Sequence, residues 1–136
     1  MEEEPKKYFT PKAVEALIPE LTQIMGRLMD AHSEVQQIRS VLREEQRRIM
    51  VAGGGLLDQE TWRESTQRLE ELTREIQQGI ATIVKLGGAP KDLGMGLVDF
   101  PYLLDNREVN LCWRFGETKI RFWHDLEEGY AGRKPL

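Results

Sequence analysis

The sequence lacks three features, and each absence excludes a class of protein. A single cysteine, Cys112, cannot form an intrachain disulfide, so we expect a reducing, cytoplasmic setting. No stretch approaches the roughly 18 consecutive apolar residues of a membrane-spanning helix. Lysine and arginine total 19 against 23 acidic residues, for a net charge of −4, so the chain lacks the overall basic surface of many nucleic-acid binders. Membranes and nucleic acids are therefore not expected partners.

The composition that remains is that of an ordinary soluble protein. The opening residues, MEEEPKKYF, are acidic and lack the apolar core of a secretory signal. Hydrophobic residues make up 40% and charged residues 31% of the 136 positions, which favours one domain spanning 1–136. Much of the charge is glutamate and arginine in the first 80 residues, which is typical of solvent-exposed helices.

Residues 10–50 are predicted to form a first helix. Thr10 suits the N-cap, and Pro11 suits the first helical position, where its missing N–H costs nothing. Pro19 falls inside the pattern and predicts a break or a kink. Apolar residues recur at alternating steps of four and three, as in a coiled-coil seam. The stripe comprises Leu17, Leu21, Ile24, Leu28, Ala31, Val35, Ile38, Leu42 and Ile49, with Glu45 as its charged member.

Residues 58–86 are predicted to form a second helix. Three glycines in VAGGGLLDQE interrupt the first helix, and Asp58 suits the N-cap of the next one. The stretch KLGGAP ends the second helix, because its glycines favour a C-terminal cap and its proline prevents continuation. Two long helices joined by a short connection must run antiparallel.

Residues 97–126 change to a period of two, which predicts a small antiparallel sheet followed by a tail at 127–136. A strand in GLVDF is expected to end at Pro101. The dipeptide Gly116–Glu117 is interpreted as a two-residue turn. That turn places Cys112 and His124 on opposite faces of the sheet. On the face that packs against the helices, the turn pairs Trp113 with Ile120, Leu111 with Phe122 and Val109 with His124. The other face then carries Cys112, Arg114, Arg121 and Trp123. The expected fold is α+β, a long antiparallel helical hairpin with a C-terminal sheet.

His124 is the centre of a candidate metal site. Imidazole and carboxylate ligands suit zinc, iron or manganese, and the candidate partners are Asp125, Glu128, His32 and Glu34. Adjacent strand residues point to opposite faces, so His124 and Asp125 share an ion only where the strand ends or bulges. The alternative is a histidine that satisfies a hydrogen bond at the end of the sheet.

Two further polar residues carry weaker hypotheses. Cys112 would be a nucleophile with His124 as its base, but no signature surrounds it and the interpreted turn separates the two side chains. Asp99, which precedes a phenylalanine and a proline, is expected to bond to a backbone amide or to an arginine. An enzyme is therefore less expected than a binding protein.

Several sequence blocks resemble a known family. The blocks are GLVDFP at 96–101, LCWR at 111–114 and WHDLEEGYAGRKPL at 123–136, together with the opening YFTPKAVEALIPEL. They resemble a bacterial family catalogued only as a domain of unknown function, and the resemblance covers nearly the whole chain. It implies a bacterial, cytoplasmic protein and carries no activity.

The patterns predict a small interaction or scaffold-like protein that self-associates through its helices. The apolar seam of a lone hairpin is incompletely covered, which favours a homodimer or a protein partner on that seam. The alternative function is a small metalloprotein, with or without an enzyme activity, centred on His124.

Overall fold

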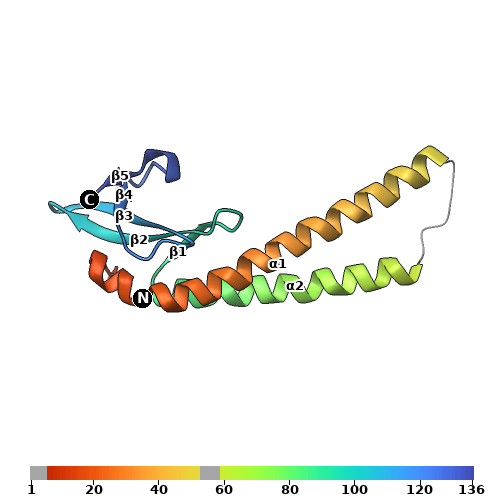
Figure 1. Cartoon of the computed structure of the whole chain (residues 1–136), viewed down its shortest axis with the longest axis horizontal. Helices are drawn as coiled ribbons and strands as arrows, with labels where there is room; N and C mark the ends of the chain where they lie inside the picture. The colour runs from red at the N-terminus through yellow and green to blue at the C-terminus, as the bar shows by residue number, and fades with distance from the viewer. Residues whose placement is uncertain (1–5, 53–58) are drawn as a thin grey trace, which may run out of the picture.

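The computed structural model describes residues 6–52 and 59–136. The chain forms two helices and then a five-stranded sheet, which confirms the α+β fold (Figure 1). The helices are α1 (Pro11–Ala52) and α2 (Gln59–Leu86). The strands are β1 (Ala89–Asp92), β2 (Leu97–Leu104), β3 (Arg107–Arg114), β4 (Phe122–His124) and β5 (Lys134–Pro135), with a 3-10 turn, η1 (Tyr130–Gly132), before β5. The predicted cap Asp58 and glycines 53–55 lie outside the described residues.

Helix α1 begins as the sequence predicts and continues further than it predicts. The N–H of Ala13 donates to Oγ1 of Thr10 at 3.1 Å, which confirms the N-cap. The helix runs through Pro19 without interruption, so of the predicted break or kink the break is wrong. Pro19 is exposed, whereas Ile18 and Leu21 beside it are buried in the core. Their burial holds the turn helical although a proline removes one backbone hydrogen bond.

Helix α2 ends at the predicted glycines. Gly87 has a φ of +104°, a conformation that favours glycine, and it follows the last helical residue, Leu86. The N–H of Gly88 donates to the carbonyl of Ile83 at 3.1 Å, which closes the helix C-terminus. The chain then turns directly into β1, a strand that the sequence interpretation did not include.

Strand β2 passes through Pro101 and ends at Leu104, so the predicted end at Pro101 is wrong. The carbonyl of Pro101 accepts a hydrogen bond from the N–H of Phe9 at 2.8 Å. The nitrogen of the same residue points to that side, away from β3, so the proline removes no bond from the β2–β3 ladder. The two-residue turn of the sheet is Asp105–Asn106, with φ of 52° and 65°.

The sheet is antiparallel throughout, in the order β1-β2-β3-β4-β5, and one face packs on the helices. Figure 1 shows the sheet beside the part of the hairpin where the chain termini lie, with the helices extending beyond it. The core joins both parts of the fold and comprises Phe9, Val14, Ile18, Leu21, Met25, Leu28, Ile83, Val98, Phe100, Leu111, Trp113 and Ile120.

The predicted β3–β4 register is wrong by one residue. Leu111 pairs with Trp123, and Asn110 pairs with His124. Seven residues, 115–121, connect β3 to β4, so Gly116–Glu117 is not a two-residue hairpin turn. Because side chains alternate across a strand, a one-residue shift exchanges the faces. Trp123 therefore packs on the core side, and His124 lies on the opposite face, together with Cys112.

Candidate functional site

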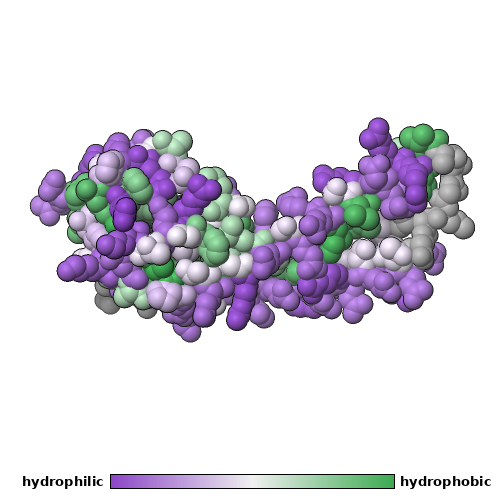
Figure 2. All heavy atoms as spheres, viewed as in Figure 1, coloured by the Kyte–Doolittle hydropathy of each residue, from purple (hydrophilic) through white to green (hydrophobic). Residues whose placement is uncertain are grey.

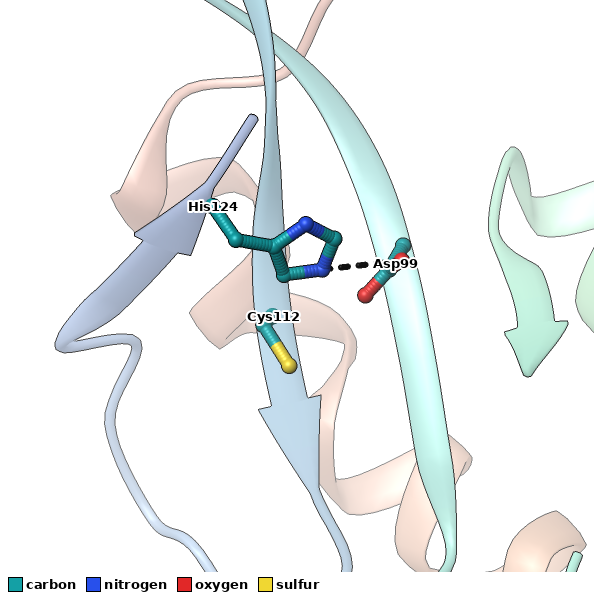
Figure 3. Close-up of side chains that lie close together, drawn as sticks. All are labelled: Asp99, Cys112 and His124. Carbon is teal, nitrogen blue, oxygen red and sulfur yellow. Dashed lines mark ion pairs between the residues drawn. The ribbon is translucent and has the colours of Figure 1, made fainter. Parts of the chain in front are cut away.

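Three adjacent strands bring Asp99, Cys112 and His124 together on the face of the sheet away from the core (Figure 3). Asp99 lies on β2 directly opposite Cys112 on β3, and His124 lies on β4. All three side chains are buried, with residue exposures of 4%, 1% and 1% respectively. Their nitrogen, oxygen and sulfur donor atoms lie within 4.8 Å of one another. We call this trio the buried cluster.

Both ring nitrogens of His124 have partners. Nε2 lies 3.1 Å from Oδ2 of Asp99, and Nδ1 lies 2.8 Å from the backbone carbonyl oxygen of Asp125. Sγ of Cys112 lies within 4.8 Å of the donor atoms of both Asp99 and His124. Asp99 therefore lies between a thiol and an imidazole, rather than on an amide or an arginine as expected from the sequence.

Burial, followed by the nearby Asp99 carboxylate, raises the pKa of the Cys112 thiol to about 12. A nucleophilic cysteine needs the opposite, a lowered pKa and an imidazole positioned to take the thiol proton. Here Nε2 of His124 faces the Asp99 carboxylate and Nδ1 faces a backbone carbonyl, so both ring nitrogens already have partners other than the thiol. The arrangement does not suit covalent catalysis, but its three donor types suit a metal ion.

A small cavity of about 120 Å³ adjoins the buried cluster. Its wall includes Asp99, Cys112 and His124 on one side, and Glu128 and Tyr130 of the C-terminal tail on the other. The tail thus closes over this face of the sheet and leaves a space that can hold a water molecule next to the three donor atoms.

The predicted partners Asp125 and Glu128 form ion pairs of their own. The ammonium of Lys134 lies 3.1 Å from Asp125 and 2.8 Å from Glu128, and Arg107 lies 3.2 Å from the other oxygen of Asp125. The hydrogen bond from Lys134 is the largest cause of the lowered pKa of Asp125. These two carboxylates hold the tail against the sheet, and Glu128 also lines the cavity beside His124.

The predicted partners His32 and Glu34 lie on α1 and are not members of the buried cluster. Glu34 makes a two-pronged contact with Arg68 of α2, in which Nη2 of the arginine lies 3.0 Å from Oε1. The hydrogen bonds from Arg68 lower the pKa of Glu34. Glu34 therefore joins the two helices, while the neighbours of His124 are Asp99 and Cys112, neither of which was among the predicted metal partners.

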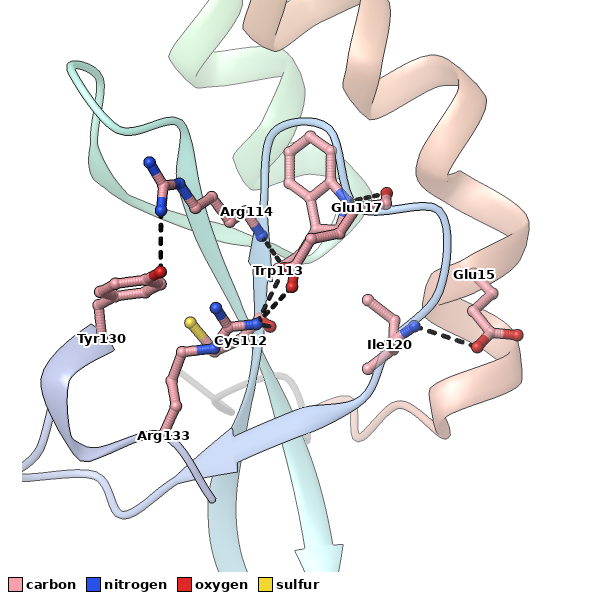
Figure 4. Close-up of polar contacts among 8 residues, drawn as sticks. All are labelled: Glu15, Cys112, Trp113, Arg114, Glu117, Ile120, Tyr130 and Arg133. Atoms are coloured by element: carbon pink, nitrogen blue, oxygen red, sulfur yellow. Dashed lines mark hydrogen bonds and ion pairs between the residues drawn. The ribbon is translucent and has the colours of Figure 1, made fainter. Parts of the chain in front are cut away.

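A polar network fixes the β3–β4 connection and with it the position of His124 (Figure 4). The guanidinium of Arg133 lies 2.7 Å from the Glu117 carboxylate and is stacked on the Phe122 ring at 4.0 Å. The indole N–H of Trp113 donates to the Glu117 carbonyl at 3.0 Å. The N–H of Ile120 donates to Glu15 of α1 at 3.1 Å, although the two are far apart in sequence.

The second candidate site is the outer end of the hairpin, residues 36–52 of α1 and 59–71 of α2, which we call the distal arm. Figure 1 shows the helices diverging there, and Figure 2 shows apolar side chains on their inner side. A groove of about 1140 Å³ lies between them and is lined by Ile49, Met50 and Trp62. Met50 is 83% exposed and Trp62 37% exposed.

The distal arm also separates charge. Its α1 part carries four arginines and two glutamates, a net charge of +2. Its α2 part, 59–71, carries two arginines and four glutamates, a net charge of −2. The two helical segments of the distal arm therefore differ in the sign of their net charge.

Comparison with known proteins gives one match. A family model described as "Uncharacterized conserved protein (DUF2203)" matches residues 7–136. No curated protein and no solved structure matches the chain. Within the described residues, neither helix is long and apolar enough to cross a membrane. The family match confirms the resemblance drawn from the sequence blocks, while a bacterial source stays a prediction.

Proposed function

The chain belongs to the DUF2203 family of uncharacterized conserved proteins, so we propose a function from its own geometry: it is an interaction module that self-associates through the distal arm. One observation carries the proposal. The apolar spacing of α1 continues along the arm after burial has stopped. Ile38, Leu42 and Ile49 keep the spacing of four and three but are only partly buried, and Val35 is the last fully buried residue among the α1 side chains that the structure describes.

The arm lacks the core that stabilises the rest of the hairpin. In α2 the first buried residue among those described is Leu72, so neither helix buries a side chain fully within the arm. Helical segments of about 12–15 residues are marginal in water without tertiary packing. Each large apolar side chain removed from water contributes roughly 1.5–3 kcal/mol. A partner that fills the groove would therefore stabilise the arm considerably.

Charge supports a second copy of the chain as that partner. In a two-fold symmetric pair, each contact occurs twice, and the surface of one copy must complement itself. The α1 part of the arm has a net positive charge and the α2 part a net negative charge, so α1 of one copy suits α2 of the other in both halves of the pair. Two hairpins joined in this way form a four-helix bundle, a common arrangement for paired helical hairpins.

The test is the mass of the chain in solution, measured by light scattering between about 1 and 100 µM. We expect the mass of a dimer in the upper part of this range. Ile49→Asp places a charge in the groove and should give a monomer. Val84→Asp is the control, because Val84 is 57% exposed on α2 outside the arm and the substitution should leave the dimer intact. A monomeric wild-type chain at 100 µM contradicts the proposal.

A cytoplasmic location belongs to the same proposal. It is supported by Cys112, which is a free buried thiol, as expected of a protein kept in a reducing compartment.

A further inference from the structure

We propose that Asp99, Cys112 and His124 bind one divalent transition-metal ion, and that zinc suits their donor set best. This site lies on the sheet, separate from the distal arm, and its argument does not depend on self-association.

The hydrogen bonds of His124 determine which of its ring nitrogens carries the proton. A backbone carbonyl oxygen can only accept hydrogen bonds, so the Nδ1 atom that lies 2.8 Å from the Asp125 carbonyl must carry a proton. In the neutral ring, Nε2 then has a lone pair, and it faces Oδ2 of Asp99 at 3.1 Å. Two acceptors cannot face each other at this distance without a cation between them. That cation is either a proton or a metal ion.

The contact between Nδ1 of His124 and the backbone carbonyl of Asp125 is itself typical of a metal-binding histidine. Histidines that bind metals donate their other ring N–H to a carbonyl or a carboxylate, which fixes the tautomer and aims the free nitrogen at the ion. The Nδ1 contact of His124 provides this arrangement. It results from the strand end, because β4 finishes at His124 and the carbonyl of the next residue turns back to the ring.

Cys112 supplies a third donor atom, its sulfur, beside the Asp99–His124 pair. A proton shared between Asp99 and His124 explains those two residues and gives the Cys112 thiol no particular role. A metal ion uses all three, since imidazole nitrogen, thiolate sulfur and carboxylate oxygen are all zinc ligands, at about 2.0–2.3 Å from the ion. Ligands of one tetrahedral ion therefore lie roughly 3–4 Å apart. The Asp99–His124 separation of 3.1 Å fits this spacing, and a small movement of Sγ brings the third donor within it.

Charge and space are also suitable. A divalent cation balances a thiolate and a carboxylate, so the buried cluster would be neutral with the ion bound and the thiol proton released. The adjoining cavity of about 120 Å³ can hold a water molecule as the fourth ligand. Magnesium and calcium are less suitable, because they prefer shells made of oxygen ligands.

The test uses the full chain without a histidine tag. The protein is treated with a chelator, incubated with Zn²⁺, dialysed and analysed for zinc. We expect about one zinc per chain for the wild type and little for His124→Ala or Cys112→Ala. His32→Ala is the matched control and should keep the zinc, because His32 lies on α1 outside the buried cluster. Substituting Co²⁺ for Zn²⁺ should give a thiolate-to-cobalt absorption band that Cys112→Ala removes.

Two readouts keep the test decisive where a substitution disturbs folding. Added Zn²⁺ should raise the Tm of the chelator-treated wild type, and Asp99→Asn, which keeps the side-chain size, should weaken the shift. Circular dichroism reports whether each variant is folded. A wild-type chain that takes up neither Zn²⁺ nor Co²⁺ in stoichiometric amount overturns the proposal, and so does zinc uptake that persists in folded His124→Ala and Cys112→Ala.

Discussion

The two ends of the hairpin use the same apolar spacing in different ways. Near the sheet, the stripe of α1 is covered, and Leu21 and Leu28 are 0% and 2% exposed. In the distal arm the stripe continues through Leu42 and Ile49, which are only partly buried, and the adjacent Met50 and Val51 are largely exposed. Helical periodicity therefore identifies the apolar face of a helix but does not show whether the element that covers this face belongs to the same chain.

The difference has a physical cause in the length of the elements. The longest strands of the sheet have 8 residues, whereas α1 has 42. At about 3.3 Å per strand residue and 1.5 Å per helix residue, the sheet covers less than half of the helix. The remaining length has only α2 beside it, and the two helices diverge there (Figure 1).

The largest expected effect comes from two tryptophans, one from each region. Trp113 is fully buried on β3 and its indole N–H has a partner, so Trp113→Ala should lower the free energy of unfolding by about 3–5 kcal/mol. Trp62 lines the groove of the arm, and Trp62→Ala should cost less than about 1 kcal/mol when the chain is monomeric. Denaturant unfolding at concentrations where the chain is monomeric measures both losses of stability. Equal losses would contradict the contrast between the regions.

A smaller effect is expected from two glycines with similar φ angles. Gly87 and Gly116 have φ of +104° and +99°, so alanine is strained at both positions. A Cβ at position 87 would also collide with the ring of Phe9, whereas nothing lies within 4 Å at position 116. Gly87→Ala should therefore cost about 1–3 kcal/mol more than Gly116→Ala in the same unfolding experiment. A difference near zero would show that the Phe9 ring moves aside without lowering the free energy of unfolding.

The smallest effect is expected from the ion pair Glu34–Arg68, which joins the two helices where the distal arm begins. Arg68 lowers the pKa of Glu34 below its ordinary value of 4.5. The pair therefore contributes stability above that pH, and the contribution is lost as the pH falls through the lowered pKa. Both side chains are partly exposed, so the effect should be small and weaken with salt.

The measurement compares Glu34→Gln with wild type from pH 7 down to pH 3. Wild type should be slightly more stable at pH 7, and the difference should vanish at the acidic end. Glu20→Gln, at an exposed glutamate of α1, serves as the control for the loss of a charge. A difference that grows toward low pH would contradict the assigned sign.

The parts of the fold that could be predicted from the sequence are those set by local signals. Thr10 begins α1 through its own side chain, and Gly87 ends α2 through its own backbone angle. The β3–β4 register could not be predicted in this way, because it depends on residues distant in sequence. Ile120 is held by Glu15 of α1, and Glu117 by Arg133 of the tail, so the dipeptide at 116–117 does not act as an isolated turn.

The candidate site followed from the same register. His124 was identified from its residue type, but its neighbours depend on strand pairing, and a one-residue error placed His124 on the core face, opposite Cys112. Asp99 and Cys112 are direct cross-strand partners, a relation that the turn at Asp105–Asn106 determines. Recognising that dipeptide as the tight turn would have paired the two residues from sequence alone.

The most direct measurement is amide hydrogen exchange of the wild-type chain at two concentrations, one below and one above the dimerisation range. We expect that protection in the distal arm, residues 36–52 and 59–71, rises with concentration, while protection in β2 and β3 does not change. Equal protection of the arm at both concentrations would show that a single chain already stabilises it, and would contradict self-association through the distal arm.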